Sequence, residues 1–286
     1  MPPARIRPRF DVVWFGQRGA SLDPEVFTRL NERDPDDRGH YIVMPTTEHK
    51  ADIERVGNRL AHYHKSLNTD ESKRATWPNL SAEFMAKGIA DRHAAAGFAT
   101  RWIFVNEISA TRWPAAPGYR RWVIDVARHL EGEGFNVAIF SPFAKLRPNR
   151  PAGPDWKTLS DHAWIVIEGY LSGRRILEQM RNGDALAWSR NCYLEMRKSY
   201  EHYGVPRRRL FIAEHFGHTQ HGPRRNWGRC GISQKNWLAA IEARSTAARD
   251  VGFAGYVSFA WMYNQMQAPR PHLLRCCKTY ADARLP

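Results

Sequence analysis

Short apolar runs alternate along this chain with segments of helical pattern, and this alternation constrains the fold more than any other feature. Residues 101–107 show it most clearly, because an apolar run from Trp102 to Val105 ends abruptly in Asn106 and Glu107. Aromatic and β-branched composition of this kind is typical of a strand buried on both faces. Similar runs recur at residues 10–15, 40–44, 135–140, 163–167, 209–213 and 255–260. Strands that alternate with helices predict a parallel β/α architecture.

Seven strands are visible in this pattern, one fewer than a (β/α)8 barrel needs. The deficit lies in the N-terminal third, where Ile53, Val56, Leu60 and Tyr63 share one face of a predicted helix. We expect a (β/α)8 TIM-type barrel, or a close derivative with an atypical N-terminal third, formed by residues 1–286 as a single domain. A doubly wound open sheet is the alternative, although no glycine-rich phosphate loop follows either of the first two strands.

Composition narrows the class of protein. No apolar run approaches the roughly 20 residues of a membrane span, so we expect no membrane insertion. The start of the sequence lacks a hydrophobic signal core, which makes a cytoplasmic location the default expectation, or secretion if a signal has been removed. The net charge of +14 favours an anionic partner. The basic residues are scattered, however, and no nucleic-acid-binding motif is present, so nucleic acid is not the expected partner.

Three of the predicted strands end in a glutamate. In β/α proteins the C-terminal ends of the strands form the site. Counting back from the last strand as the eighth places Asn106 and Glu107 on the fourth strand, Glu168 on the sixth and Glu214 on the seventh. A carboxylate at the end of a buried strand is costly unless it is paired. Each glutamate is therefore expected either to serve a site or to pair with one of the many arginines.

Three short motifs support a catalytic interpretation: Val105-Asn106-Glu107, Ile212-Ala213-Glu214 and Phe259-Ala260-Trp261. Their order and strand placement resemble the clan A glycoside hydrolases, and the resemblance covers roughly the last two thirds of the chain. In that clan an Asn-Glu at the end of strand four supplies the acid/base, a Glu at the end of strand seven the nucleophile, and a Trp at the end of strand eight the floor of the sugar subsite. The resemblance implies these roles for Glu107, Glu214 and Trp261.

Further residues are expected to bind substrate. The resemblance implies that Asn106 hydrogen-bonds the sugar hydroxyl next to the anomeric carbon and that Tyr170 hydrogen-bonds the nucleophile. Glu168 departs from the clan's commoner pattern, and we expect it to replace one member of the catalytic pair, contact substrate or pair with an arginine. Aromatic faces at strand ends can stack on sugar rings, which adds Trp14 and Tyr263.

The loop after the seventh strand carries His215, His218, His221 and Cys230, whose spacing does not match a zinc motif. We expect no metal and no cofactor, and assign His215 to substrate contact.

The chemistry explains the need for two carboxylates. Cleavage of a glycosidic bond passes through an oxocarbenium-like state, in which one carboxylic acid protonates the leaving oxygen and a carboxylate attacks or activates water. We therefore expect a retaining glycoside hydrolase with a carbohydrate substrate, and the basic net charge points toward an acidic glycan. The alternative is a non-catalytic barrel that binds a glycan or another anionic polymer through its basic surface. The sugar, the linkage and the oligomeric state are not fixed by the sequence.

Overall fold

Nine parallel strands form one sheet in the computed structural model, which describes residues 12–15, 41–44, 59–60, 62–64, 67, 77–97, 101–147, 152–171, 173–215 and 234–259. For the first four strands only the backbone is described. The strands are β1 (Val12–Phe15), β2 (Tyr41–Met44), β3 (Arg59–Leu60), β4 (His62–His64), β5 (Trp102–Val105), β6 (Asn136–Ser141), β7 (Trp164–Glu168), β8 (Leu210–His215) and β9 (Gly255–Phe259). Their order across the sheet is β3-β2-β1-β9-β8-β7-β6-β5-β4.

The two ends of this strand order, β3 and β4, are joined through the chain. Leu60 ends β3 and His62 begins β4, so a single residue separates them. Two residue steps span at most about 7 Å of chain. The strand that pairs with β2 and the strand that pairs with β5 are therefore brought together. Counted as one interrupted strand, β3 and β4 occupy the third of eight positions in a closed ring. The structure thus confirms the TIM-type barrel and excludes the open sheet.

The eighth strand is the one that the sequence pattern concealed. The predicted helix over Ile53, Val56, Leu60 and Tyr63 is wrong at its C-terminal end, because Leu60 lies in β3 and Tyr63 in β4. The local pattern was misleading because strand formation here depends on pairing with β2 on one side and β5 on the other. Such neighbours outweigh intrinsic preference in a sheet. Ile53 and Val56 lie outside the described residues.

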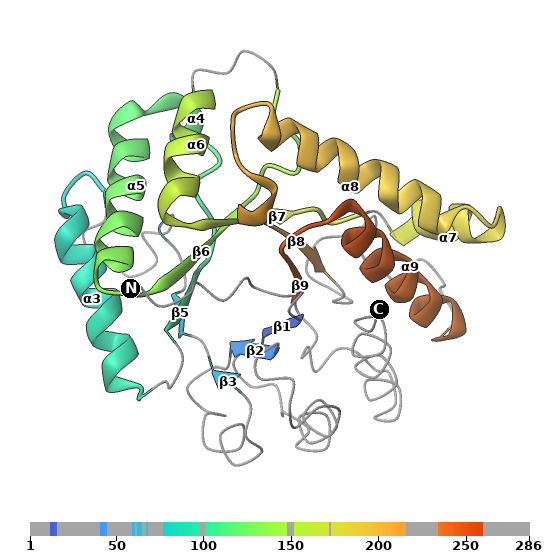
Figure 1. Ribbon diagram of the computed structural model, residues 1–286, viewed down its shortest axis with the longest axis horizontal. Helices are drawn as coiled ribbons and strands as arrows, with labels where there is room; N and C mark the ends of the chain where they lie inside the picture. The colour runs from blue at the N-terminus through green and yellow to red at the C-terminus, as the bar shows by residue number, and fades with distance from the viewer. Residues whose placement is uncertain are drawn as a thin grey trace, which may run out of the picture.

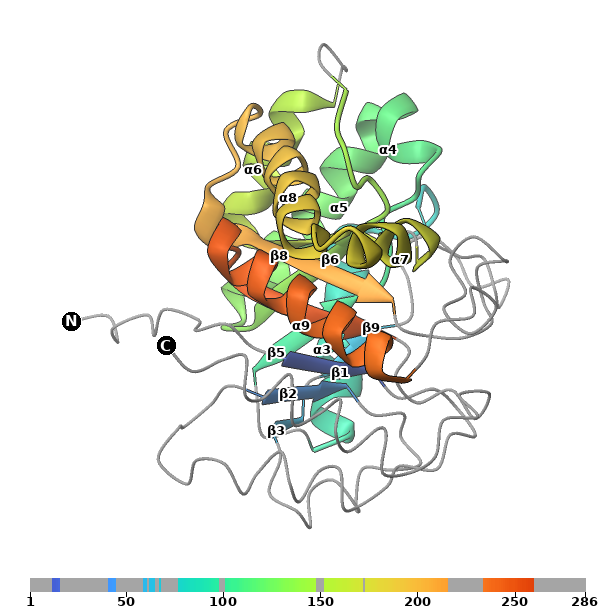
Figure 2. The ribbon, with the colours of Figure 1, turned by 90° about the vertical axis from the view of Figure 1, so that its right-hand side faces the viewer.

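Helices cover the outside of the ring along the arc from β5 to β9 (Figure 1). They are α3 (Ala82–Ala95), α4 (Arg112–Ala115), α5 (Pro117–Gly132), α6 (Gly153–His162), α7 (Gly173–Arg181), α8 (Ala185–Glu201) and α9 (Gln234–Val251). A short break separates α7 from α8, since α7 ends at Arg181 and Gly183 adopts a positive φ of 76°. Helices α8 and α9 pack against each other over β8 and β9 (Figures 1 and 2).

Two apolar clusters separate the faces of the strands. One contains Ile103, Val105, Ile165, Ile167 and Ile212 together with side chains of the helices, so it is the layer between sheet and helices. The other contains Phe104, Phe140, Val166, Phe211 and Val257 and is packed only from strands and their ends, so it fills the barrel interior. Neighbouring residues on the strands from β5 to β9 alternate between the two clusters, as the period of a strand requires. This alternation tells which way each strand-end side chain faces.

Candidate active site at the C-terminal mouth of the barrel

Glu107 stands at the mouth of β5 in a left-handed conformation, with φ of 31°. Among the described residues it is the only non-glycine residue with a positive φ. This strained state costs on the order of 1–3 kcal/mol. The following residues fix this turn. Ile108 N donates to Phe140 O at 3.0 Å, and Ser109 N donates to the Tyr119 hydroxyl at 3.1 Å. Strain held in place by such contacts occurs at functional sites.

The left-handed turn also interrupts the alternation of β5. Trp102 and Phe104 face the interior and Ile103 and Val105 the helices, so Asn106 continues the interior series. Strict alternation would carry Glu107 outward, but the turn intervenes. Glu107 remains half-buried, and burial raises the pKa of its carboxyl above the ordinary value of 4.5. A carboxyl with a raised pKa is suited to donating a proton near neutral pH.

Glu168 and Tyr170 face the interior side of the mouth. Val166 packs in the interior cluster and Tyr170 packs against it, so Glu168, placed between them on alternate positions, shares their face. The Tyr170 hydroxyl hydrogen-bonds Glu168. The pKa of Tyr170 is raised well above its ordinary value of 10.0, chiefly by burial and then by the negative charges of Glu168, Glu107 and Glu214. Tyr170 therefore stays protonated and donates its hydrogen bond. We name Asn106, Glu107, Glu168 and Tyr170 the mouth cluster.

Glu214 faces the opposite way. Phe211 and Ala213 pack in the interior cluster, whereas Leu210 and Ile212 pack in the helix layer, so Glu214 continues the outward series. Its contacts agree with this assignment. The Tyr193 hydroxyl on α8 donates to Oε1 at 2.5 Å, and Arg244 Nη1 on α9 donates to Oε2 at 3.0 Å. The Glu214 side chain is 0% exposed.

The structure thus brings Glu107, Glu168 and Tyr170 together, with Glu214 close enough to influence Tyr170 but turned toward the helices. The other predicted residues are described only in part. Trp14 lies in β1 and His215 ends β8, but only their backbones are described. Trp261 and Tyr263 lie outside the described residues, so their roles stay predictions.

Tyr193 and Arg244 are site-related residues that the sequence pattern did not identify. Both are fully buried, and each lies on a helix rather than at a strand end. An arginine on the same helical face as the buried Ala240, Ala247 and Ala248 is a weak sequence signal for a buried ion pair. Its partner stands 30 positions earlier in the chain, and only the packing of α9 against β8 reveals it.

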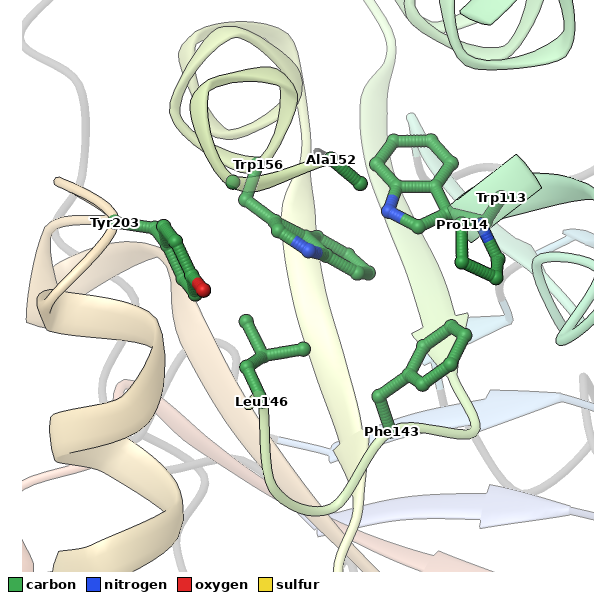
Figure 3. A pocket seen from close by; sticks show the side chains of 8 residues that line it. Trp113, Pro114, Phe143, Leu146, Ala152, Trp156 and Tyr203 are labelled. Carbon is green, nitrogen blue, oxygen red and sulfur yellow. The ribbon is translucent and has the colours of Figure 1, made fainter. Parts of the chain in front are cut away.

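A small aromatic pocket lies apart from the mouth cluster (Figure 3). Its walls come from α4, the segment after β6, the start of α6 and the turn after α8. The lining residues are Trp113, Pro114, Phe143, Leu146, Ala152, Gly153, Trp156 and Tyr203. No member of the mouth cluster lines it, and most of its lining side chains belong to the helix layer or pack against it.

The described residues contain no group of three or more histidines, cysteines, aspartates or glutamates arranged to hold a metal ion. Among the described helices, none combines the length and the apolar character needed to cross a bilayer.

The fold and the mouth define a (β/α)8 barrel that carries carboxylates where its parallel strands end. No protein-family model and no curated protein sequence matches the chain. Solved structures with this fold include several glycoside hydrolases. A class V chitinase from Nicotiana tobaccum has a TM-score of 0.57 at 8% identity, over 95% of this chain and 99% of that one.

A glycoside hydrolase family 5 enzyme from Prevotella bryantii, solved with a xyloglucan tetradecasaccharide, has a TM-score of 0.56 at 11% identity, over 98% of this chain and 97% of its own. A broad-specificity endoglucanase from an uncultured bacterium has a TM-score of 0.50 at 12% identity, over 93% and 86%. At these identities the similarity establishes the fold, and function has to be argued from the site.

Proposed function

We propose that this protein is a glycoside hydrolase in which Glu107 is the acid/base. The observation that carries the proposal is the state of Glu107: a half-buried carboxyl with a raised pKa, held in a left-handed turn at the mouth of the fourth strand. A surface glutamate whose only role is a salt bridge gains nothing that would offset the cost of a strained backbone conformation. The solved glycoside hydrolases of the same fold support the proposal, because they use barrels of this kind on oligosaccharides.

Glycosidic cleavage needs a second carboxylate, and Glu107 has acidic neighbours to supply it. In a retaining enzyme the two carboxyls stand about 5–5.5 Å apart, and in an inverting enzyme about 6.5–9.5 Å apart. The resemblance to clan A names Glu214 as the nucleophile of a retaining reaction, and this assignment stays a prediction. Glu168 is the other candidate, because it shares the interior face and acts on Tyr170 together with Glu107.

The mouth cluster favours a neutral glycan at the point of cleavage. It contains the carboxyl groups of Glu107 and Glu168, whereas the charge of Glu214 is balanced by its ion pair with Arg244. An anionic sugar in direct contact with these groups would be repelled. The net charge of +14 then serves another part of the surface or the solubility of the chain.

Hydrolysis tests the proposal. Aryl β-glycosides of glucose, xylose and N-acetylglucosamine, with good and with poor leaving groups, form the first panel, and xyloglucan and chitin oligosaccharides the second. Glu107→Gln should lower kcat/KM by about 10²–10⁴ on poor leaving groups, since these need protonation, and far less on good ones. The exposed Glu133→Gln is the matched control and should leave both rates unchanged. Equal rates for Glu107→Gln and the unmodified protein would remove Glu107 from the mechanism.

The alternative function is a barrel without turnover that binds an anionic polymer through its basic surface. The net charge of +14 is the observation that favours it. Affinity for heparin would then fall steeply with salt, because bound counterions are released, and Glu107→Gln would not change it. Glycoside hydrolysis that depends on Glu107 decides against this alternative.

A further inference from the structure

A buried ion pair lies directly behind the mouth cluster. Glu214 and Arg244 are each 0% exposed, and Arg244 Nη1 donates to Glu214 Oε2 at 3.0 Å. The Tyr193 hydroxyl donates to the other carboxylate oxygen. The pair joins β8 to α8 and α9, and we name Glu214, Arg244 and Tyr193 the lock.

The lock restrains the segment that follows β7, because it hydrogen-bonds both the backbone amide and the backbone carbonyl of Leu171. Leu171 N donates to Glu214 Oε2 at 3.4 Å, and Arg244 Nη2 donates to Leu171 O at 3.0 Å. A second constraint comes one step earlier, where Gly169 N donates to Ala213 O at 3.0 Å. A side chain on Gly169 would also meet Ile212, since its Cβ would lie 2.4 Å from Cδ1.

Because side chains alternate along the backbone, these restraints also determine which way Tyr170 faces. Gly169 faces the helix layer, where Ile212 and Met196 crowd it, and Leu171 packs in the same layer. Tyr170, between them, therefore faces the interior, where it packs against the interior cluster and hydrogen-bonds Glu168. Fixing the residues on both sides of Tyr170 fixes the direction of its hydroxyl.

We propose that Glu214 is a positioning residue, and that Glu168 is the second reacting carboxylate opposite Glu107. The inference rests on the proposed glycoside hydrolase function and reassigns its nucleophile. Two observations carry it: Glu214 is 0% exposed and points to the helices, whereas Glu168, which is 9% exposed, is on the interior face beside Tyr170. A nucleophile must reach the anomeric carbon, and a carboxylate enclosed by Arg244, Tyr193 and Leu171 does not.

The reaction then balances as a double displacement. A Glu168 oxygen bonds to the anomeric carbon while the bond from that carbon to the leaving oxygen breaks and Glu107 gives that oxygen its proton. Water next attacks the anomeric carbon, Glu107 takes one proton from the water, and the bond to Glu168 breaks. Tyr170 donates its hydrogen bond to Glu168.

Kinetics of three glutamine variants test the assignment. Glu168→Gln should lower kcat/KM at least about 10³-fold on aryl glycosides with good and poor leaving groups alike, because the nucleophile serves both. Glu107→Gln should spare good leaving groups. Glu214→Gln keeps an acceptor oxygen for Arg244 and Leu171, and should stay within about tenfold of the unmodified protein with the same pH profile. A loss of 10³-fold in Glu214→Gln alone overturns the proposal.

Chemical rescue distinguishes the two carboxylates if Glu168→Gln and Glu214→Gln both lose activity. Azide replaces a missing nucleophile and gives the glycosyl azide. Rescue of Glu168→Ala and not of Glu214→Ala supports the assignment, and the reverse result refutes it.

Hydrogen exchange tests the positioning role without any substrate, so its outcome is independent of whether the proposed function holds. In Arg244→Met the peptide that contains Tyr170 and Leu171 should exchange at least about tenfold faster, because Leu171 loses its restraint. Arg190→Met is the matched control: Arg190 pairs with Asp250 across the same two helices but at the surface. It should leave that peptide unchanged. Equal exchange in Arg244→Met and the unmodified protein overturns the role of the lock.

Discussion

Replacing Arg244 by methionine tests the energetics of the lock. Methionine keeps much of the length of the arginine and removes its charge, so Glu214 is left charged and enclosed. For charges 3.0 Å apart, Coulomb's law with an effective dielectric constant near 20 gives about 5–6 kcal/mol. Mutational experience with buried pairs that lose one partner gives about 3–5 kcal/mol of lost stability. Arg244→Met also removes the donor to Leu171 O.

A melting curve converts this free energy into a temperature. A chain of 286 residues has an unfolding entropy of about 600 cal/mol/K. A loss of about 3–5 kcal/mol then lowers Tm by about 5–8 °C, measured by calorimetry and checked by urea unfolding followed through tryptophan fluorescence.

Two variants make the interpretation specific. The double variant Glu214→Leu with Arg244→Met removes both charges and should be more stable than Arg244→Met alone, because no unpaired charge stays buried. It should not recover fully, since the Tyr193 hydroxyl and the Leu171 backbone lose their partners. The surface variant Arg190→Met should cost less than about 1 kcal/mol, since its pair is 46% and 33% exposed. If Arg244→Met melts within about 1 °C of the unmodified protein, or the double variant is no better than the single one, the reasoning from an enclosed ion pair is refuted.

Three further predictions concern other parts of the described structure. The alkaline limb of the kcat/KM profile should lie above pH 4.5, because burial raises the pKa of Glu107 and the acid acts while protonated; Glu107→Gln should abolish that limb. Ser81→Ala should lower stability by about 1 kcal/mol in urea unfolding, since the Ser81 hydroxyl accepts from Phe84 N at 3.2 Å and caps α3. Gly153→Ala should lower stability by about 1–3 kcal/mol, because the new Cβ would lie 2.3 Å from Tyr203 Cε1; an unchanged Tm in either variant would contradict the contact on which it rests.

Much of the barrel follows from local pattern. The strands from β5 to β9 match the predicted apolar runs to within two residues at each end, because a strand buried on both faces must be apolar throughout. Counting those strands placed Glu107 on the fourth position, Glu168 on the sixth and Glu214 on the seventh, and the sheet order confirms these ring positions. The third strand was missed, since its two pieces are held by pairing with β2 and β5 rather than by composition.

The sequence by itself determined which residues end the strands and therefore which carboxylates reach the C-terminal rim. It could not determine which face each carboxylate takes. Period-two counting groups Glu214 with Leu210 and Ile212, and Ala213 with Phe211, but both groups are apolar in a strand buried on two sides. Only the packing of α8 and α9 against β8 assigns the Glu214 face to the helices, where Arg244 and Tyr193 meet it. Tertiary structure alone decides this, because ion-pair partners far apart in sequence leave no local periodic signal.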